Sequence, residues 1–317
     1  MRKIISYKNP CVFQGSKYLE GNKNYFEGWY FKNTRDNISI SFIPGISINK
    51  NERKAFIQVI TNDNSYNIDY DINEFEYSNN PFKIRIGRSY FTFDSIHIDI
   101  DDKKKNLIIY GDLEYTKSRN ITTNWLSPNI MGIFSYIPYM ECNHAIISMN
   151  NRINGSLSVN NRDINFNNGI GYIEKDWGCS FPKEYIWCQG NNFDNKSVSF
   201  MLSIADIPFK LFSFRGFICS LIIDNKEYRF ATYNGSKIIK YDTSNNCVNI
   251  VLKKDYYLLE VNAICKDGFS LRAPVKGEMS KDIIESVSSE INIKLKKRKK
   301  VIFADKSRTC GLEVVRD

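Results

Sequence analysis

Three short segments of this chain combine carboxylates with aromatic side chains at spacings that suit acid–base chemistry. The richest runs from Gly169 to Gly178 (GIGYIEKDWG), where Tyr172, Glu174 and Asp176 are two residues apart. Residues two apart on a β-strand point to the same face, so these three side chains are expected to lie together. Two neighbouring carboxyl groups in an apolar site disfavour each other's ionisation, so one can stay protonated and act as a general acid. The alternative is an acidic pair on the surface, bridged to lysine or arginine.

The second segment, residues 25–32 (YFEGWYFK), places a single carboxylate among aromatic side chains. Strand alternation puts Glu27 on the face that carries Trp29 and Phe31. This pattern predicts a Glu27 side chain that points into an aromatic cavity. An exposed glutamate on an edge strand is the alternative.

The third segment, residues 181–191 (FPKEYIWCQGN), has Tyr185, Trp187 and Gln189 on one strand face. An amide beside an indole indicates either a site that orients a ligand or an ordinary hydrogen-bonded core. The chain has two histidines. His97 alternates with isoleucines and is expected to be a strand residue facing solvent, whereas His144 follows an apolar stretch and is a further catalytic candidate.

Several common types of site are disfavoured by the residues present. Two histidines are too few for a His-rich metal site, and the eight cysteines form no C-x-x-C pair, so no metal site is expected. The motifs G-x-S-x-G, P-loop and G-x-G-x-x-G do not occur, which argues against hydrolase, NTPase and dinucleotide-binding functions.

Composition indicates an ordinary folded protein. Of 317 residues, 42% are hydrophobic and 25% charged. Neither a signal-like apolar run nor a stretch of about 18 apolar residues occurs, so we expect a cytoplasmic protein with free thiols, at most peripheral at a membrane. Abundant Asn, Ile and Lys indicate an AT-rich, bacterial source.

The net charge of +9 is largely local, because six basic residues lie in Lys294–Lys300. This run is expected to be a solvated strand end, or a weak contact with anionic lipid at a membrane surface. No nucleic acid is expected as a partner, because no aromatic RNA-binding motif accompanies the run.

Alternation with a period of two residues dominates the chain and predicts many short antiparallel strands. It is clear in Asn37–Ile43, Ile84–Phe93 and Ile96–Ile100, and the 14% aromatic content also favours strands. The fold is therefore expected to be all-β, with two antiparallel barrels or strongly curved sheets. Only Lys281–Ser289 has a helical pattern.

The apolar stretch 116–143 interrupts this rhythm and carries Trp125, Pro128 and Pro138. We place the division of the chain at its end. Residues 1–143, including the stretch, are expected to form an N-terminal unit, and residues 144–317 a C-terminal one. The stretch is either a linker buried between them or an apolar lid over a ligand cavity.

Taken together, these segments resemble the tocopherol cyclase family. The resemblance rests on motifs in the family's order: Phe26–Tyr30, Ser127–Gly132, Glu141–His144, Gly171–Gly178, Ser180–Pro182, Trp187–Gln189, Leu271–Pro274 and Gly311–Val315. It implies two tandem lipocalin-like β-barrels. It also implies closure of a chromanol ring on a prenylated hydroquinone, without cofactor or redox change.

The resemblance also implies roles for individual residues. The position of Asp176 is often an amide in plant members, whereas Glu174 matches, so Glu174 is the expected proton donor. Glu27 or Asp176 is then a second acid or the acceptor of the phenol proton. His144 is a further candidate for the acid. The residues expected to bind the substrate are Trp29, Tyr172, Trp177, Trp187 and Gln189.

Ring closure of this kind needs a neutral acid in an apolar cavity, where aromatic faces stabilise the developing cation and water is excluded. Two other functions suit the same residues. A protein of this kind can bind a lipophilic small molecule without transforming it, or it can hydrate an isoprenoid double bond by admitting water.

Overall fold

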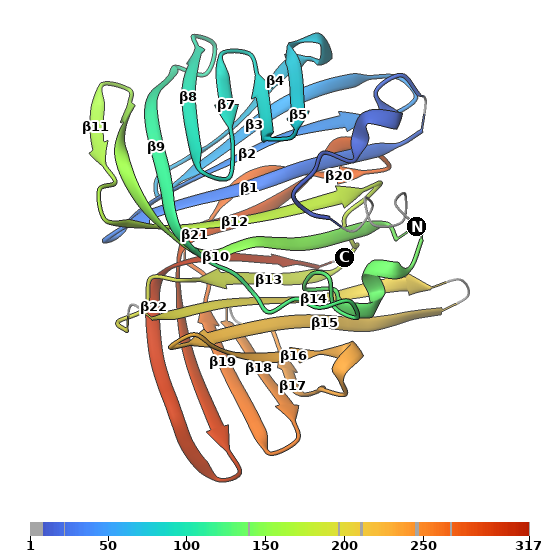
Figure 1. The fold of residues 1–317 in the computed structure, drawn as a ribbon, viewed down its shortest axis with the longest axis vertical. Helices are drawn as coiled ribbons and strands as arrows, with labels where there is room; N and C mark the ends of the chain where they lie inside the picture. The colour runs from blue at the N-terminus through green and yellow to red at the C-terminus, as the bar shows by residue number, and fades with distance from the viewer. Residues whose placement is uncertain are drawn as a thin grey trace.

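The structure is almost wholly antiparallel β-structure in two sheets (Figure 1). It is a computed structural model that describes residues 9–21, 23–138, 140–195, 197–209, 212–244, 247–266 and 268–316. Helical elements in these ranges are short 3₁₀ turns: η1 (Gly15–Tyr18), η2 (Ile72–Glu74), η3 (Gly132–Tyr136) and η4 (Thr232–Asn234). The expected all-β class with little helix is therefore confirmed.

The first sheet has twelve strands and occupies the upper part of Figure 1. Its main path runs β4-β3-β2-β1-β12-β10-β9-β8-β7-β6-β5, with β11 paired to β10. The bounds are β1 (Tyr25–Arg35), β2 (Ile38–Ile48), β3 (Arg53–Thr61), β4 (Ser65–Asp71), β5 (Phe75–Asn79), β6 (Phe82–Ile86), β7 (Ser89–Phe91), β8 (Ser95–Asp102), β9 (Leu107–Arg119), β10 (Cys142–Val159), β11 (Arg162–Asn165) and β12 (Gly169–Gly178).

The second sheet has ten strands and follows in the chain. Its path runs β16-β15-β14-β13-β22-β21-β19-β18-β17, with β20 paired to β21. The bounds are β13 (Tyr185–Gly190), β14 (Val198–Phe209), β15 (Phe212–Ile223), β16 (Lys226–Ala231), β17 (Lys237–Asp242), β18 (Cys247–Lys254), β19 (Tyr257–Ile264), β20 (Phe269–Val275), β21 (Glu278–Lys297) and β22 (Lys300–Val315). Over the described residues neither path returns to its first strand, so the sheets are curved and open, not closed barrels.

The sheets divide the chain later than expected. The predicted division at residues 143 and 144 falls at the start of β10, which belongs to the first sheet together with β12. The first sheet ends at Gly178 and the second begins at Tyr185. The reason is that β1 pairs with β12 along nine positions, so the strands after the apolar stretch complete the N-terminal sheet.

Because side chains alternate between the two faces of each strand, the buried hydrophobic residues form three separate clusters. One buried cluster fills each curved sheet, and a third joins residues of both sheets, among them Tyr30 and Tyr172 from the first and Trp187 and Val287 from the second. Side chains on one face of a strand therefore pack inside their own sheet, and those on the other face pack between the sheets. This sorting decides which of the candidate residues can meet.

The predicted helix at Lys281–Ser289 is wrong, because these residues lie within β21. Ile283, Glu285 and Val287 are buried at every second position, and β21 pairs on both sides with other strands. Strand pairing and burial outweigh the weak helical preference of so short a segment.

The basic run Lys294–Lys300 lies where β21 turns into β22, at the far end of the long hairpin in Figure 1. Its last four side chains are exposed, and its contact with anionic lipid stays a prediction. Within the described residues, no helix is both long and apolar enough to cross a membrane.

Candidate active site

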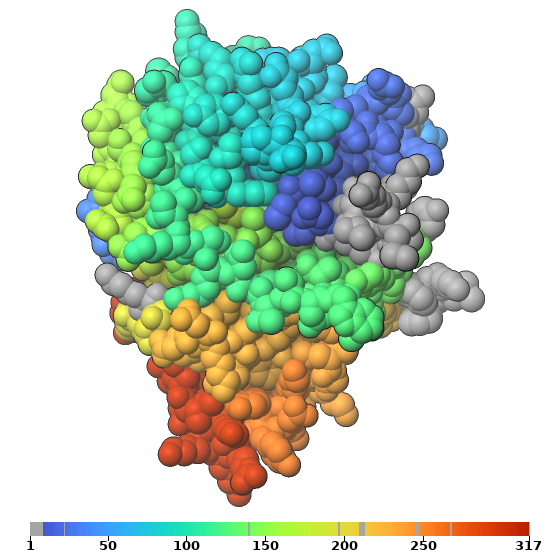
Figure 2. All heavy atoms as spheres, viewed as in Figure 1, coloured from blue at the N-terminus to red at the C-terminus, as the bar shows by residue number. Residues whose placement is uncertain are grey.

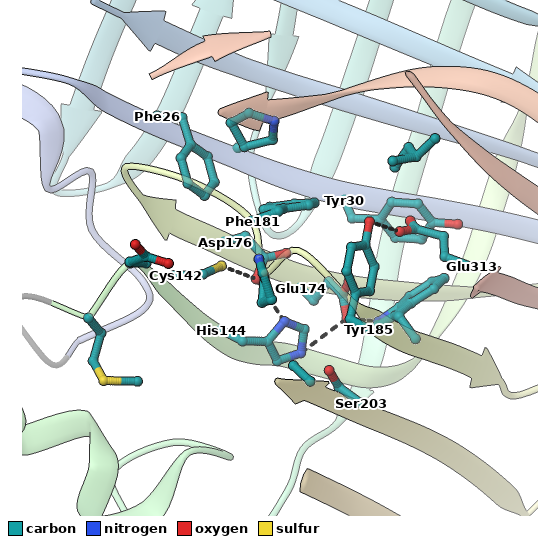
Figure 3. Close-up of a pocket in the computed structure, with 18 of the residues that line it drawn as sticks. Phe26, Tyr30, Cys142, His144, Glu174, Asp176, Phe181, Tyr185, Ser203 and Glu313 are labelled. Atoms are coloured by element: carbon teal, nitrogen blue, oxygen red, sulfur yellow. Dashed lines mark hydrogen bonds and ion pairs between the residues drawn. The ribbon is translucent and has the colours of Figure 1, made fainter. Parts of the chain in front are cut away.

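A cavity of about 600 Å³ lies between the two sheets, within the range typical of small-molecule sites. Most of its lining is apolar, and its polar groups come from both sheets (Figure 3). The polar and aromatic lining residues used below are Tyr30, His144, Glu174, Asp176, Tyr185, Trp187, Glu285 and Glu313.

The apolar stretch between β9 and β10 forms part of this lining. Met131, Phe134, Ile137, Pro138 and Met140 all border the cavity. Figure 2 shows this segment, in green, lying across one face of the molecule between the first sheet and the second. Of the two interpretations of residues 116–143, an apolar cover over a cavity fits this position.

His144, Glu174 and Asp176 meet at one wall of the cavity (Figure 3). His144 on β10 is directly opposite Asp176 on β12, and its Nδ1 lies 2.8 Å from Asp176 Oδ1. Its Nε2 lies 3.4 Å from Glu174 Oε2, an ion-pair distance. The predicted alternation in the segment Gly171–Gly178 therefore places both carboxylates on the cavity face, and His144 joins them from the neighbouring strand.

Glu174 is surrounded by hydrogen-bond donors. Its Oε2 accepts from the hydroxyl of Tyr172 at 2.5 Å and from Nε1 of Trp187 at 3.2 Å. Tyr30, directly opposite Glu174 on β1, packs edge-on against the Trp187 ring with centroids 5.2 Å apart. A carboxyl group held by aromatic donors is fixed in direction while the faces around it stay apolar.

The surroundings of Glu174 and His144 raise the pKa values of both groups, to neutral pH or above. Burial raises the pKa of Glu174 to about 7, although the positive charge of His144 partly offsets this. Burial lowers the pKa of His144, but the nearby charges of Asp176 and Glu174 outweigh that effect and raise it to about 9. An imidazolium beside a partly protonated carboxyl group is thus expected at neutral pH.

A second pair of carboxyl groups, Glu285 and Glu313, also borders the cavity and was not predicted as part of the site. Glu285 on β21 lies directly opposite Glu313 on β22. The hydroxyl of Tyr30 donates to Glu285 Oε1 at 2.6 Å, and that of Tyr185 donates to Glu313 Oε2 at 2.6 Å. Glu313 falls within one of the motifs of the family resemblance, but Glu285 was concealed by the expected helix.

Glu27 lies outside the cavity, which corrects its predicted place beside Glu174. Its side chain and that of Lys175 are fully buried in the core of the first sheet, with Lys175 Nζ 2.6 Å from Glu27 Oε1. Tyr25 donates its hydroxyl to Glu27 Oε2 at 2.5 Å. Alternation correctly predicted that Glu27 points inward among aromatic side chains, but that face of β1 is the interior of its own sheet.

The tryptophans are divided in the same way. Trp187 borders the cavity, whereas Trp29 and Trp177 pack in the core of the first sheet beneath the Lys175 ammonium group, 5.2 and 4.7 Å from it. The prediction that all three indoles share one cavity is therefore wrong, because Trp29 and Trp177 occupy the opposite strand faces from Tyr30 and Glu174.

Two further predicted substrate-binding residues lie behind the wall. Tyr172 is fully buried between the sheets and reaches the site through its hydrogen bond to Glu174. Gln189 is also fully buried, and its Oε1 accepts from Lys32 Nζ at 3.1 Å. Neither is among the residues that border the cavity.

Within the described residues, His144, Glu174 and Asp176 form a group that could hold a metal ion, since their ligand atoms lie within 4.8 Å of one another. An imidazole must be neutral to bind a metal, however, and the two carboxylates favour its charged form. The expectation that no metal takes part stays a prediction.

Residues 110–315 match the model of a protein family described as tocopherol cyclase-like, which is more than half of the chain. The chain belongs to the tocopherol cyclase-like family. A probable chloroplastic tocopherol cyclase of rice (Oryza sativa subsp. japonica) is 24% identical over 172 residues, which is 52% of this chain and 34% of the rice protein. The matched region thus spans about a third of that family member's length.

Several solved structures share the fold of the present chain at low sequence identity. CghA with Sch210972 has a TM-score of 0.59 at 8% identity, covering 92% of this chain and 89% of CghA. A putative AttH from Nitrosomonas europaea has a TM-score of 0.53 at 12% identity, covering 91% and 92%. Kievitone hydratase from Nectria haematococca has a TM-score of 0.53 at 10% identity, covering 96% and 93%. These likenesses support the expected lipocalin-like, all-β fold.

Proposed function

We propose that this family member is a cyclase or hydratase-like enzyme that protonates a double bond of a lipophilic isoprenoid in the cavity between the sheets. The preferred reaction is closure of a chromanol ring on a prenylated hydroquinone. The observation that carries this proposal is Glu174: a buried carboxyl group with a pKa of about 7, aimed into an apolar cavity beside Trp187 and Tyr30. The name of the rice relative and the family description support the same class.

The reaction balances without an oxidant or reductant. Glu174 gives its proton to the less substituted carbon of the alkene, and the π electrons form that C–H bond, which leaves a tertiary cation. The faces of Trp187 and Tyr30 stabilise this cation, and such contacts contribute about 2 kcal/mol or more when desolvated. The phenol oxygen then forms the C–O bond and loses its proton.

His144 and Asp176 make Glu174 a better acid. When Glu174 gives up its proton, the negative charge appears 3.4 Å from the His144 ring. The imidazolium, held by Asp176, stabilises this carboxylate, as do the donors from Tyr172 and Trp187. These groups are in place before the reaction, so no reorganisation is needed at the transition state.

Hydration of the double bond is the second candidate. The side chains of His144 and Asp176 are 13% and 21% exposed, so this wall borders water as well as the apolar cavity. A cation formed beside it would react with water if no phenol oxygen were in reach. Kievitone hydratase, a structural neighbour, is named for a hydration, which is consistent with this alternative. Binding of a lipophile without reaction is disfavoured by the inward direction of Glu174.

The decisive experiment measures conversion of phytylated or geranylgeranylated hydroquinone to chromanol. Glu174→Gln should reduce turnover by about 10²–10⁴-fold, as expected for loss of a general acid. The affinity of this variant for the substrate should change little, as measured by quenching of the tryptophan fluorescence, because the amide keeps the shape of the carboxyl group. Asp176→Asn should have a milder effect. Full activity of Glu174→Gln would show that Glu174 is not the proton donor. Tight binding of the hydroquinone by the wild-type protein without turnover would favour the binding function.

A further inference from the structure

Two glutamates on neighbouring strands of the second sheet form a group that the chemistry above does not use. Glu285 and Glu313 occupy directly opposed positions on β21 and β22, so their side chains leave the sheet on the same face. Glu285 is fully buried, Glu313 is 9% exposed, and both border the cavity that holds Glu174. Trp187, which donates to Glu174, is the residue directly opposite Glu313 on its other side, on β13.

The two carboxyl groups are held in different environments. Tyr30 donates to Oε1 of Glu285, but no group among the described residues donates to the buried Oε2 of Glu285. Tyr185 donates to Oε2 of Glu313, and both of these side chains reach the cavity, as Figure 3 shows. Glu285 thus lies deeper, with one oxygen unsatisfied as an acceptor, whereas Glu313 receives a donor at the cavity wall.

Like charges this close in a buried site cannot both ionise at neutral pH. Burial and the neighbouring Glu313 raise the pKa of Glu285 well above its usual range. Burial raises the pKa of Glu313 to about 7, while the donors from Tyr185 and Glu285 work against this. The pair therefore holds one proton on Glu285 and exchanges a second on Glu313.

We propose that Glu313 accepts the proton that leaves the substrate hydroxyl as the ring closes, with Glu285 kept protonated behind it. This role rests on the proposed function, and it is the role that the sequence analysis gave to Glu27 or Asp176. As the C–O bond forms, the O–H bond of the hydroxyl breaks and its proton passes to the Glu313 carboxylate, directly or through the hydroxyl of Tyr185. One proton enters the substrate from Glu174 and one leaves to Glu313, so the product is an isomer of the substrate.

The matched variants Glu313→Gln and Glu285→Gln test this assignment because the two carboxyls are predicted to differ. Glu313→Gln removes the acceptor, so kcat/KM should fall by about 10²-fold or more. In the wild-type protein, kcat/KM should fall at low pH as Glu313 becomes protonated, and this fall should be absent in Glu313→Gln. Glu285→Gln replaces a neutral acid by a neutral amide that still donates, and should retain activity within about tenfold. Glu290→Gln, on the same strand but paired with surface Lys266, is the control and should match wild type.

Each outcome separates this role from the proposed function. Wild-type turnover with an unchanged rate and pH profile in Glu313→Gln would overturn the role of Glu313 alone. Equal losses in Glu285→Gln and Glu313→Gln would overturn the predicted division between the two. Absence of turnover by the wild-type protein would overturn the proposed function and, with it, the role of Glu313.

Infrared spectroscopy of the resting protein provides a readout that needs no substrate. Above the pKa values of Glu174 and Glu313, both about 7, a protonated carboxyl C=O band should remain in wild type because Glu285 keeps its proton. The band should persist in Glu313→Gln and disappear in Glu285→Gln. A wild-type spectrum with only ionised carboxylates at that pH would contradict the proposal even if neither variant folds.

Discussion

His144 and Asp176 face each other across β10 and β12, with Nδ1 and Oδ1 2.8 Å apart. Because the histidine follows the apolar stretch and the aspartate lies 32 residues later, only strand pairing brings them together. The pair fixes the direction of the ring, so that its other nitrogen faces Glu174. It thus couples the charge of the imidazole to the proton of the proposed acid.

This coupling predicts an unusual titration of His144. Its resonance in a pH titration by NMR should have a midpoint near pH 9, because the carboxylates of Asp176 and Glu174 stabilise the charged form. Asp176→Asn should lower that midpoint toward the ordinary value of about 6.5. His97, the other histidine, is an internal reference. An unchanged His144 midpoint in Asp176→Asn would contradict the assignment.

Gly311 is predicted to be essential for the position of Trp187. A Cβ atom at Gly311 would lie 2.5 Å from Cζ3 and 2.7 Å from Cη2 of the Trp187 ring, so the indole would have to move. Gly311→Ala should therefore weaken the hydrogen bond to Glu174, shift the tryptophan emission and reduce turnover by about tenfold or more. Gly21→Ala, where the nearest atom would be 3.6 Å away, is the control. Wild-type activity in Gly311→Ala would show that the indole position is not critical.

Glu27 and Lys175 are predicted to act on stability and not on turnover. Glu27→Gln leaves a buried ammonium group without its carboxylate, which typically costs about 3–5 kcal/mol of unfolding free energy. The double variant Glu27→Gln/Lys175→Met removes both charges and should lose less. Denaturant unfolding measures the unfolding free energy of each variant. The variants that fold should keep the wild-type kcat. A large loss of kcat in a stably folded Glu27 variant would restore its catalytic candidacy.

Removal of metal ions is predicted to leave the activity unchanged. A metal ion at His144, Glu174 and Asp176 would have to displace the proton of an imidazolium with a pKa of about 9, which weakens binding at neutral pH despite the favourable spacing. The measurement is turnover after dialysis against EDTA, compared with protein supplied with Zn²⁺. Activity that is lost on dialysis and restored by the metal would refute the prediction.

Local sequence was sufficient for most of the strands and for the grouping of side chains on their faces. Because successive strand residues point to opposite sides, the spacing in the segment Gly171–Gly178 placed Tyr172, Glu174 and Asp176 together. The same alternation is present in β21, where Ile283, Glu285 and Val287 are buried, but there the pattern also suits a helix. In so short a segment, propensity and periodicity do not separate helix from strand.

Only the tertiary structure decided which strand face borders the cavity. Both faces of β1 are buried and carry large aromatic side chains, so the residues of the strand alone do not distinguish the interior of the first sheet from the space between the sheets. Glu27 therefore looked like a site residue, yet its partner Lys175 lies on the neighbouring strand, 148 positions along the chain. The pairing of Glu285 with Glu313 likewise depends on strand register, because two residues far apart in sequence share a proton only when folding sets them side by side.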